Sequence, residues 1–313
     1  MDIASSSSRA LSQGALPRSW RSRARPLLGT LVEITLPYDR HGGEAAFVNA
    51  TDLAFSRIEA IHHAMSFHEA TSDVRAIASA AAGDVVTVSP ETWQVLLLAA
   101  EIERDSQGVF NVAIASELVA RGQLPTPGAL LNSPNATSLA SSIALEPPDQ
   151  ISVLQPVWID LGGIAKGYAV DAAVNALQKT GVSAGVVNAG GDLRVFGSAR
   201  HRLALRIPAA PTVRIEVAEL QDLSCATSGG YFSADSDADA STLAAHPAIV
   251  GNRAQAMVAV ASVSVIAKRC AVADALTKVV WLRGIHDLMC ADLLAQHSAH
   301  VVLLDAKGVV ARF

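Results

Sequence analysis

The segment around Lys166 has the residue types of an anion-binding turn. Residues 157–161 form a short apolar run that predicts a strand, and Gly162 and Gly163 then open a turn. Apolar residues at helical spacing follow from 170 to 177. A strand, a glycine turn, one cation and a helix N-terminus bring backbone N–H groups and a positive charge together, which suits phosphate. Alternatively the glycines serve turn geometry alone, because no Ser or Thr follows the lysine as in a P-loop.

A second candidate site lies on a helix predicted for residues 271–282. On a helical wheel its aliphatic residues fall on one side, while Asp274, Thr277 and Lys278 gather on the other. A carboxylate and a hydroxyl one turn apart suit a hard cation, and Mg²⁺ takes few protein ligands and leaves the rest to phosphates and water. The alternative is a solvated Asp–Lys pair at i,i+4.

The composition indicates a globular protein with a sizeable core. Of 313 residues, 50% are hydrophobic and 17% are charged, and the formal net charge is −5. Apart from four arginines between positions 18 and 25, the basic residues are scattered, which argues against a nucleic-acid partner. The longest apolar run, 256–267, is too short to span a bilayer.

The N-terminus and the cysteines bear on the compartment. Residues 1–24 predict a disordered basic tail, and residues 25–313 predict one domain. The tail shows neither a secretory signal nor a lipoprotein anchor, and the three cysteines at unrelated spacings suit a reducing compartment. The sequence as written therefore predicts a cytoplasmic protein, with the periplasmic side as the alternative if its start is misassigned.

The remaining patterns predict an α+β fold. Residues 30–36 alternate as a half-buried strand, residues 44–64 have helical spacing, and Ser89 followed by a proline opens another helix. Residues 121–156 predict a loop with a short hairpin, and residues 226–231 predict a glycine-rich turn. Further strands are predicted at 84–88, 185–188, 193–196, 203–207, 213–217 and 258–266.

Four motifs follow one another along the chain. They are IDLGGIAKGYAVD at 159–171, VNAGGDLRVFG at 187–197, TSGGY at 227–231 and ADALTKVV at 273–280. Together they resemble the ApbE family of FAD:protein FMN transferases, with a similarity that runs, with gaps, from Pro26 to the low 280s. The resemblance implies a single domain with mixed or antiparallel sheets flanked by helices.

The resemblance also implies roles for individual residues. Those expected to contact FAD are Leu28, His68, Asn111, Gly163, Lys166 and Thr227, with Asn111 in the place of the family's aspartate. Lys166 would also act in catalysis, and His246 would be the base. Asp274 and the main chain of Ala169 would hold Mg²⁺.

Lys278 is the clearest departure from the family pattern. The family has a threonine metal ligand at this position, whereas Thr277 stands one place early. Either Thr277 replaces the missing ligand, or Lys278 pairs with Asp274 and supplies the positive charge itself. Around His246 the chain also lacks the family's Asp-Pro and Thr-Gly pairs.

The function that the resemblance implies is Mg²⁺-dependent transfer of FMN from FAD to a Thr or Ser of a target flavoprotein, with release of AMP. In phosphoryl transfer the protein mainly neutralises charge and aligns the attacking oxygen. Two alternatives stay open: an FAD-binding protein with impaired catalysis, and a Mg²⁺-dependent FAD pyrophosphatase.

Overall fold

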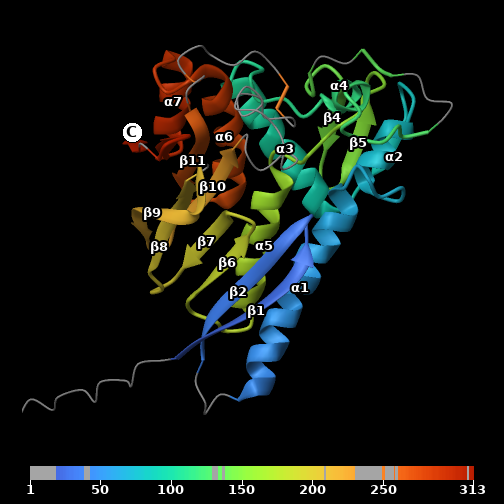
Figure 1. Ribbon diagram of the computed structural model, residues 1–313. Helices are drawn as coiled ribbons and strands as arrows, with labels where there is room; N and C mark the ends of the chain where they lie inside the picture. The colour runs from blue at the N-terminus through green and yellow to red at the C-terminus, as the bar shows by residue number, and fades with distance from the viewer. Residues whose placement is uncertain are drawn as a thin grey trace, which may run out of the picture.

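A large antiparallel sheet is the central element of the protein (Figure 1). The computed structural model describes residues 19–38, 43–128, 133–135, 138–207, 209–229, 249–250, 257, 260–308 and 310–313. The sheet has eight strands in the order β1-β2-β6-β7-β10-β11-β12-β13, each antiparallel to its neighbours. The strands are β1 (Ser19–Leu27), β2 (Thr30–Tyr38), β6 (Gly185–Ala189), β7 (Asp192–Phe196), β10 (Ser224–Gly229), β11 (Val260–Ala267), β12 (His300–Asp305) and β13 (Val310–Arg312).

Two small sheets and seven helices complete the described residues. One sheet contains β3 (Val85–Thr87), β5 (Gln150–Val153) and β4 (Ile143–Glu146), and the other pairs β8 (His201–Ile207) with β9 (Ala210–Leu220). The helices are α1 (Glu44–Met65), α2 (Asp73–Ser79), α3 (Pro90–Asp105), α4 (Ala115–Ala120), α5 (Ala165–Lys179), α6 (Cys270–Arg283) and α7 (Leu288–Gln296). The prediction of an α+β fold with antiparallel sheets is confirmed.

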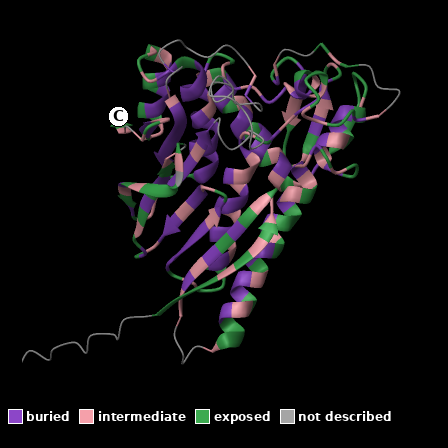
Figure 2. Ribbon diagram, viewed as in Figure 1, coloured by how far each residue is buried: buried purple, intermediate pink, exposed green. Residues whose placement is uncertain are grey.

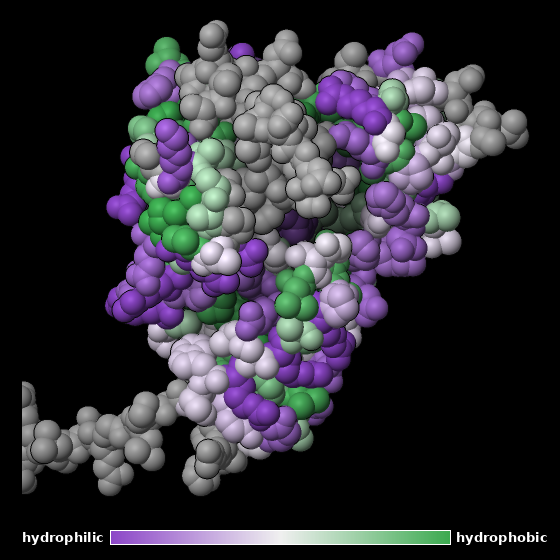
Figure 3. Space-filling view, in the orientation of Figure 1, coloured by the Kyte–Doolittle hydropathy of each residue, from purple (hydrophilic) through white to green (hydrophobic). Residues whose placement is uncertain are grey.

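The large sheet has a hydrophobic core on each face. Successive strand residues point to opposite faces, so Val265 and Val301 join the core beneath α1, α5 and α6, while Ile266 and Val302 join the core beneath the β8–β9 hairpin. Figure 2 shows that α5 and α6 are mostly buried, whereas one end of α1 is exposed. In the space-filling view, hydrophobic and hydrophilic residues are interspersed over the visible face (Figure 3).

Several predicted elements form as expected. In β2 the residues Val32, Ile34 and Leu36 are buried while their neighbours are not, as the alternation predicts. Helix α3 begins after Ser89, whose hydroxyl accepts a hydrogen bond from the backbone of Thr92. The loop between α4 and α5 contains the predicted hairpin, which is β4–β5.

The predicted disordered tail is wrong for residues 19–24, because β1 already begins at Ser19 and pairs with β2 along its length. The arginines of this strand form ion pairs with acidic residues of α1: Arg21 pairs with Glu44, and Arg23 and Arg25 pair with Asp52. The guanidinium of Arg25 also lies 4.8 Å from the ring centroid of Phe55. Residues 19–24 are therefore a strand, and residues 1–18 lie outside the described residues.

Two further predictions are wrong in detail. The apolar residues of 157–161 are buried, but the segment forms no strand; the backbone N–H of Asp160 instead donates to the carbonyl of Val112 at 2.9 Å. Residues 226–229, predicted as part of a turn, lie in β10, where they pair with residues 262–265 of β11. In β10 the loop-forming residue types were overridden by pairing with β11.

In the part of the chain that the structure describes, every helix is too short or too polar to cross a bilayer. This agrees with the expectation from the longest apolar run. The predicted compartment stays a prediction.

Candidate functional site

The glycine turn joins a buried segment to the first turn of α5. The carbonyl of Leu161 accepts the backbone N–H groups of Ile164 and Ala165, at 3.0 and 2.8 Å. The N–H of Gly162 donates to Oδ1 of Asp160 at 3.2 Å. The helix begins as predicted, without a side-chain cap at its N-terminus.

The N-terminus of α5 lies against α6. The backbone N–H of Gly167 donates to Oδ2 of Asp274 at 3.1 Å. A Cβ atom on Gly167 would stand 2.4 Å from the carbonyl oxygen of Cys270, so only glycine lets the two helices approach so closely. The backbone N–H of Gly167, which was predicted to be available to an external anion, is therefore bound to a carboxylate of the protein.

Lys166 forms an ion pair with a buried aspartate. Its Nζ lies 2.8 Å from Oδ2 of Asp192, whose side chain is 2% exposed, whereas that of Lys166 is 32% exposed. The other oxygen of Asp192 accepts the backbone N–H of Thr227 at 3.1 Å, and the hydroxyl of Thr227 bonds to that of Ser264 at 2.8 Å. Asp192 thus links Lys166 to the strand that carries Thr227.

Asp274 has partners on both carboxylate oxygens. Lys278 donates from Nζ to Oδ1 of Asp274 and, at 3.0 Å, to the main-chain carbonyl of the same residue. The hydroxyl of Thr277 donates to that same carbonyl and bonds to the hydroxyl of Ser228, both at 2.7 Å. The polar face predicted for α6 is therefore buried against α5 and β10, and Lys278 pairs with Asp274 at i,i+4 as the second interpretation holds.

The charges of these four side chains depend on one another. Burial alone would raise the pKa of Asp274, but Lys278 and Lys166 hold it below its ordinary value. Burial and the charge of Asp274 raise the pKa of Asp192. Burial alone would lower the pKa of Lys166, but Asp192 and Asp274 raise it above its usual range. Lys166 therefore stays an ammonium at neutral pH.

Two adjacent cavities meet at the glycine turn. The first, of 220 Å³, is lined by Leu28, His68 and Lys166. The second, of 370 Å³, is lined by Asn111, Gly163 and Lys278 among others. Asp160 lines both. Five of the six predicted cofactor-binding residues thus line these cavities around one short segment. The sixth, Thr227, is connected to Lys166 indirectly, because its backbone N–H donates to Asp192, which pairs with Lys166.

Ala169 is fully buried within α5, two residues beyond the Gly167 contact. His246 lies outside the described residues.

Three acidic residues were missed by sequence reasoning. Asp160 lies between the cavities, Asp192 pairs with Lys166, and both oxygens of Asp171 accept backbone N–H groups at the start of α6, from Cys270 at 3.1 Å and Ala271 at 3.0 Å. Each lies inside a motif that the sequence analysis singles out. An acid next to a glycine turn is the signal that could have found the first two.

Asp160 allows a prediction of stability against pH. Burial raises its pKa although Gly162, His68 and Lys278 oppose this, so ionising Asp160 costs more in the folded chain than in the unfolded one. This cost is absent below the pKa of an unfolded aspartate, grows as the pH rises and is complete above the raised pKa. Asp160→Asn should therefore raise the free energy of unfolding at neutral pH by about 0.5–2 kcal/mol.

Thermal melts of both proteins from acidic to neutral pH measure this difference. The gain should disappear as the pH falls through the ordinary range of aspartate, and the exposed Asp292→Asn is the matched control. A gain that is the same at every pH would show that ionisation of Asp160 is not its cause.

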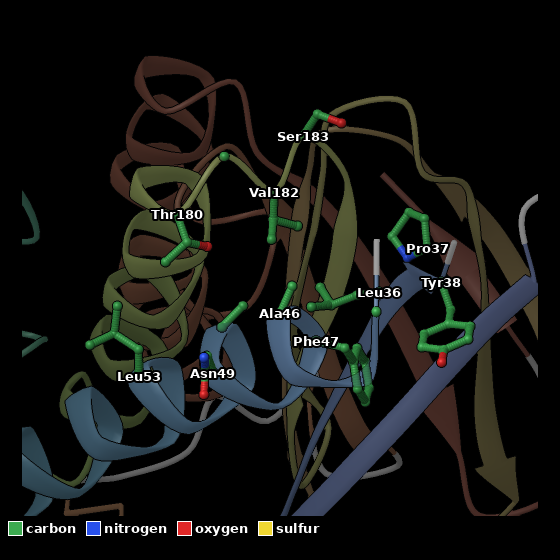
Figure 4. Close-up of a pocket in the computed structure, with 13 residues that line it drawn as sticks. Leu36, Pro37, Tyr38, Ala46, Phe47, Asn49, Leu53, Thr180, Val182 and Ser183 are labelled. Carbon is green, nitrogen blue, oxygen red and sulfur yellow. The ribbon is translucent and has the colours of Figure 1, made fainter. Parts of the chain in front are cut away.

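A third cavity, of 640 Å³, lies at the opposite end of α5 (Figure 4). Leu36, Phe47, Leu53 and Val182 contribute to its lining, and the polar residues around it are uncharged. Although it is larger than the other two, it lacks the charged groups that would hold a phosphate. We therefore place the candidate site at the glycine turn.

Comparison with known proteins gives a consistent picture. The chain matches the model of the ApbE family over residues 28–303. An FAD:protein FMN transferase of Vibrio cholerae serotype O1 is 24% identical over 186 residues, 56% of each chain, and one of Klebsiella pneumoniae is 32% identical over 155 residues, 46% of this chain and 48% of that protein. The matches thus span about half the length of these curated relatives.

The fold has solved counterparts. The crystal structure of an ApbE protein from Thermotoga maritima superposes with a TM-score of 0.75 at 23% identity, covering 94% of this chain and 97% of that one. The similarity therefore extends over nearly the whole fold. With its family match over residues 28–303, the chain belongs to the ApbE family.

Proposed function

We propose that this protein is an FAD:protein FMN transferase, which moves the FMN half of FAD onto a Thr or Ser hydroxyl of a target flavoprotein and releases AMP. The observation that carries the proposal is the pair of cavities that meet at Asp160, with Lys166 at one and Lys278 at the other. FAD consists of two bulky halves joined by an anionic pyrophosphate. Two adjacent cavities with cations at their junction suit such a ligand. The names of the curated relatives support the same activity.

In this phosphoryl transfer the protein must neutralise the negative charge of the phosphates and align the acceptor hydroxyl with the phosphorus. The oxygen of the acceptor hydroxyl forms a bond to the phosphorus of FMN, the bond from that phosphorus to the bridging oxygen breaks, and AMP leaves with that oxygen. The ammonium of Lys166 is fixed by Asp192 yet remains partly exposed in its cavity, which supports the proposal that it stabilises the developing negative charge without reorganising. His246 is the proposed acceptor of the hydroxyl proton.

The side chains predicted to bind Mg²⁺ already have partners within the protein. Both oxygens of Asp274 have partners in the protein, and the buried hydroxyl of Thr277 is bonded to Ser228 and to the carbonyl of Asp274. Among the described residues there is also no group of three or more His, Cys, Asp or Glu side chains that could hold a metal ion. The residues as placed do not offer Mg²⁺ an open ligand.

One assay separates the proposal from its alternatives. The protein is incubated with FAD and a flavoprotein acceptor, with and without Mg²⁺, and AMP release and in-gel flavin fluorescence of the acceptor are followed. Transfer gives both signals, a pyrophosphatase gives AMP alone, and an FAD-binding protein with impaired catalysis gives neither. We expect both signals, and an acceptor variant with Ala at its target Thr or Ser should remove the fluorescence. AMP release without labelled acceptor would contradict the proposal.

A further inference from the structure

The ammonium group of Lys278 is paired with the buried carboxylate of Asp274. Its side chain is 18% exposed and lies against the glycine turn, since a Cβ on Gly163 would be 3.5 Å from Cε of Lys278. Its Nζ holds the carboxylate and the carbonyl of Asp274. Lys278 is thus held by an ion pair inside the protein and also lines the larger of the two cavities at the glycine turn.

The same contacts take up the oxygens that a metal ion would need. A cation bound to Asp274 would have to displace either the ammonium of Lys278 or the backbone N–H of Gly167. If Lys278 stayed in place, its positive charge would repel the incoming cation at close range in a poorly hydrated site. The ammonium and a metal ion therefore compete for one place.

We propose that Lys278 supplies the positive charge that a bound metal ion would otherwise supply, so that this site binds a dinucleotide pyrophosphate without Mg²⁺. The inference rests on the proposed function for the identity of the ligand. The geometry alone supports the exclusion of the metal. Lys166 supplies a second cation on the other side of the glycine turn, so the pyrophosphate would meet two ammonium groups. Ammonium groups bind phosphate as point charges and need no fixed coordination geometry.

The test measures binding only, with no acceptor protein and no turnover. Free Mn²⁺ is followed by electron paramagnetic resonance as a probe of the cation site, and the affinity for FAD is measured by calorimetry in EDTA and in Mg²⁺. The variants are Lys278→Thr, which removes the ammonium and adds a hydroxyl, and Lys268→Thr, a matched change at an exposed Lys–Asp pair on the surface. Lys278→Arg keeps the positive charge. If the threonine variant does not fold, Lys278→Arg and the unaltered protein still test whether a positive charge at this position excludes Mn²⁺.

We expect the unaltered protein to bind no Mn²⁺ and to bind FAD equally well with EDTA and with Mg²⁺. Lys278→Thr should bind Mn²⁺, lose about 10- to 100-fold in FAD affinity in EDTA and regain it in Mg²⁺. Lys268→Thr should behave like the unaltered protein, and Lys278→Arg, which keeps the charge, should bind no Mn²⁺ and should have the same FAD affinity in EDTA as in Mg²⁺. Stoichiometric Mn²⁺ binding by the unaltered protein, or loss of its FAD affinity in EDTA, would overturn the inference.

Failure of the proposed function gives a different result. A protein that binds no FAD under either condition would refute the transferase proposal, while the Mn²⁺ measurement on the two proteins would still decide whether Lys278 takes the place of the metal. A protein that binds FAD without Mg²⁺ but labels no acceptor would support the inference and count against transfer.

Discussion

Gly167→Ala should destabilise the protein by about 2–4 kcal/mol, although alanine is the better helix former by about 1 kcal/mol. The added Cβ would lie 2.4 Å from the carbonyl oxygen of Cys270 and 2.8 Å from Cα of Ala271. These are backbone atoms of α6, so the clash can be relieved only by moving one helix away from the other. That movement would also break the hydrogen bond from the Gly167 amide to Asp274.

Gly163→Ala is the matched control for this effect. Its Cβ would meet Lys278 and Phe110 at 3.5 and 3.6 Å, which are ordinary contacts with side chains. Urea unfolding of both variants measures the difference, and the control should lose less than about 1 kcal/mol. Equal stability of Gly167→Ala and the unaltered protein would mean that α5 and α6 do not approach as closely as described.

Lys166→Met should lower the rate of FMN transfer about 100- to 1,000-fold, the usual effect of losing one group that stabilises transition-state charge. It should also cost about 3 kcal/mol of stability, because the carboxylate of Asp192 would remain buried without its cation. Transfer is measured by acceptor fluorescence and AMP release, and stability by urea unfolding. Both losses follow from one ammonium group with two roles.

The double variant Lys166→Met/Asp192→Asn separates these roles. Removing both charges relieves the buried carboxylate, and the asparagine oxygen can still accept the backbone N–H of Thr227. Most of the stability should return while transfer stays low. Recovery of transfer in the double variant would show that Lys166 acts only by neutralising Asp192.

The elements with regular periodicity could be predicted closely. The alternation in β2, the serine and proline before α3, and the glycines around α5 each depend on local chemistry that is visible in a few adjacent residues. Helix α1 was predicted to within one residue of its end at Met65. Local patterns were therefore reliable where one face of an element is buried.

The errors lie where distant segments decide the structure. Residues 226–229 have the composition of a loop, yet they pair residue by residue with β11, a strand that comes only after residue 259. Residues 157–161 are apolar apart from Asp160, but they pair with no strand among the described residues. The choice between Thr277 and Lys278 likewise depended on Ser228, Gly167 and the depth of α6, none of which a helical wheel contains.

Strand β1 affects how the protein behaves among other chains. It is the outer strand of the large sheet, so one side of its backbone has no partner strand among the described residues, and such edges promote aggregation by adding strands from other molecules. Arg21, Arg23 and Arg25 point toward α1, where Glu44 and Asp52 hold them. A row of inward-pointing charges makes a second layer of hydrophobic strands unfavourable at this edge. The arginines of the N-terminal segment therefore help to keep the sheet from growing between molecules.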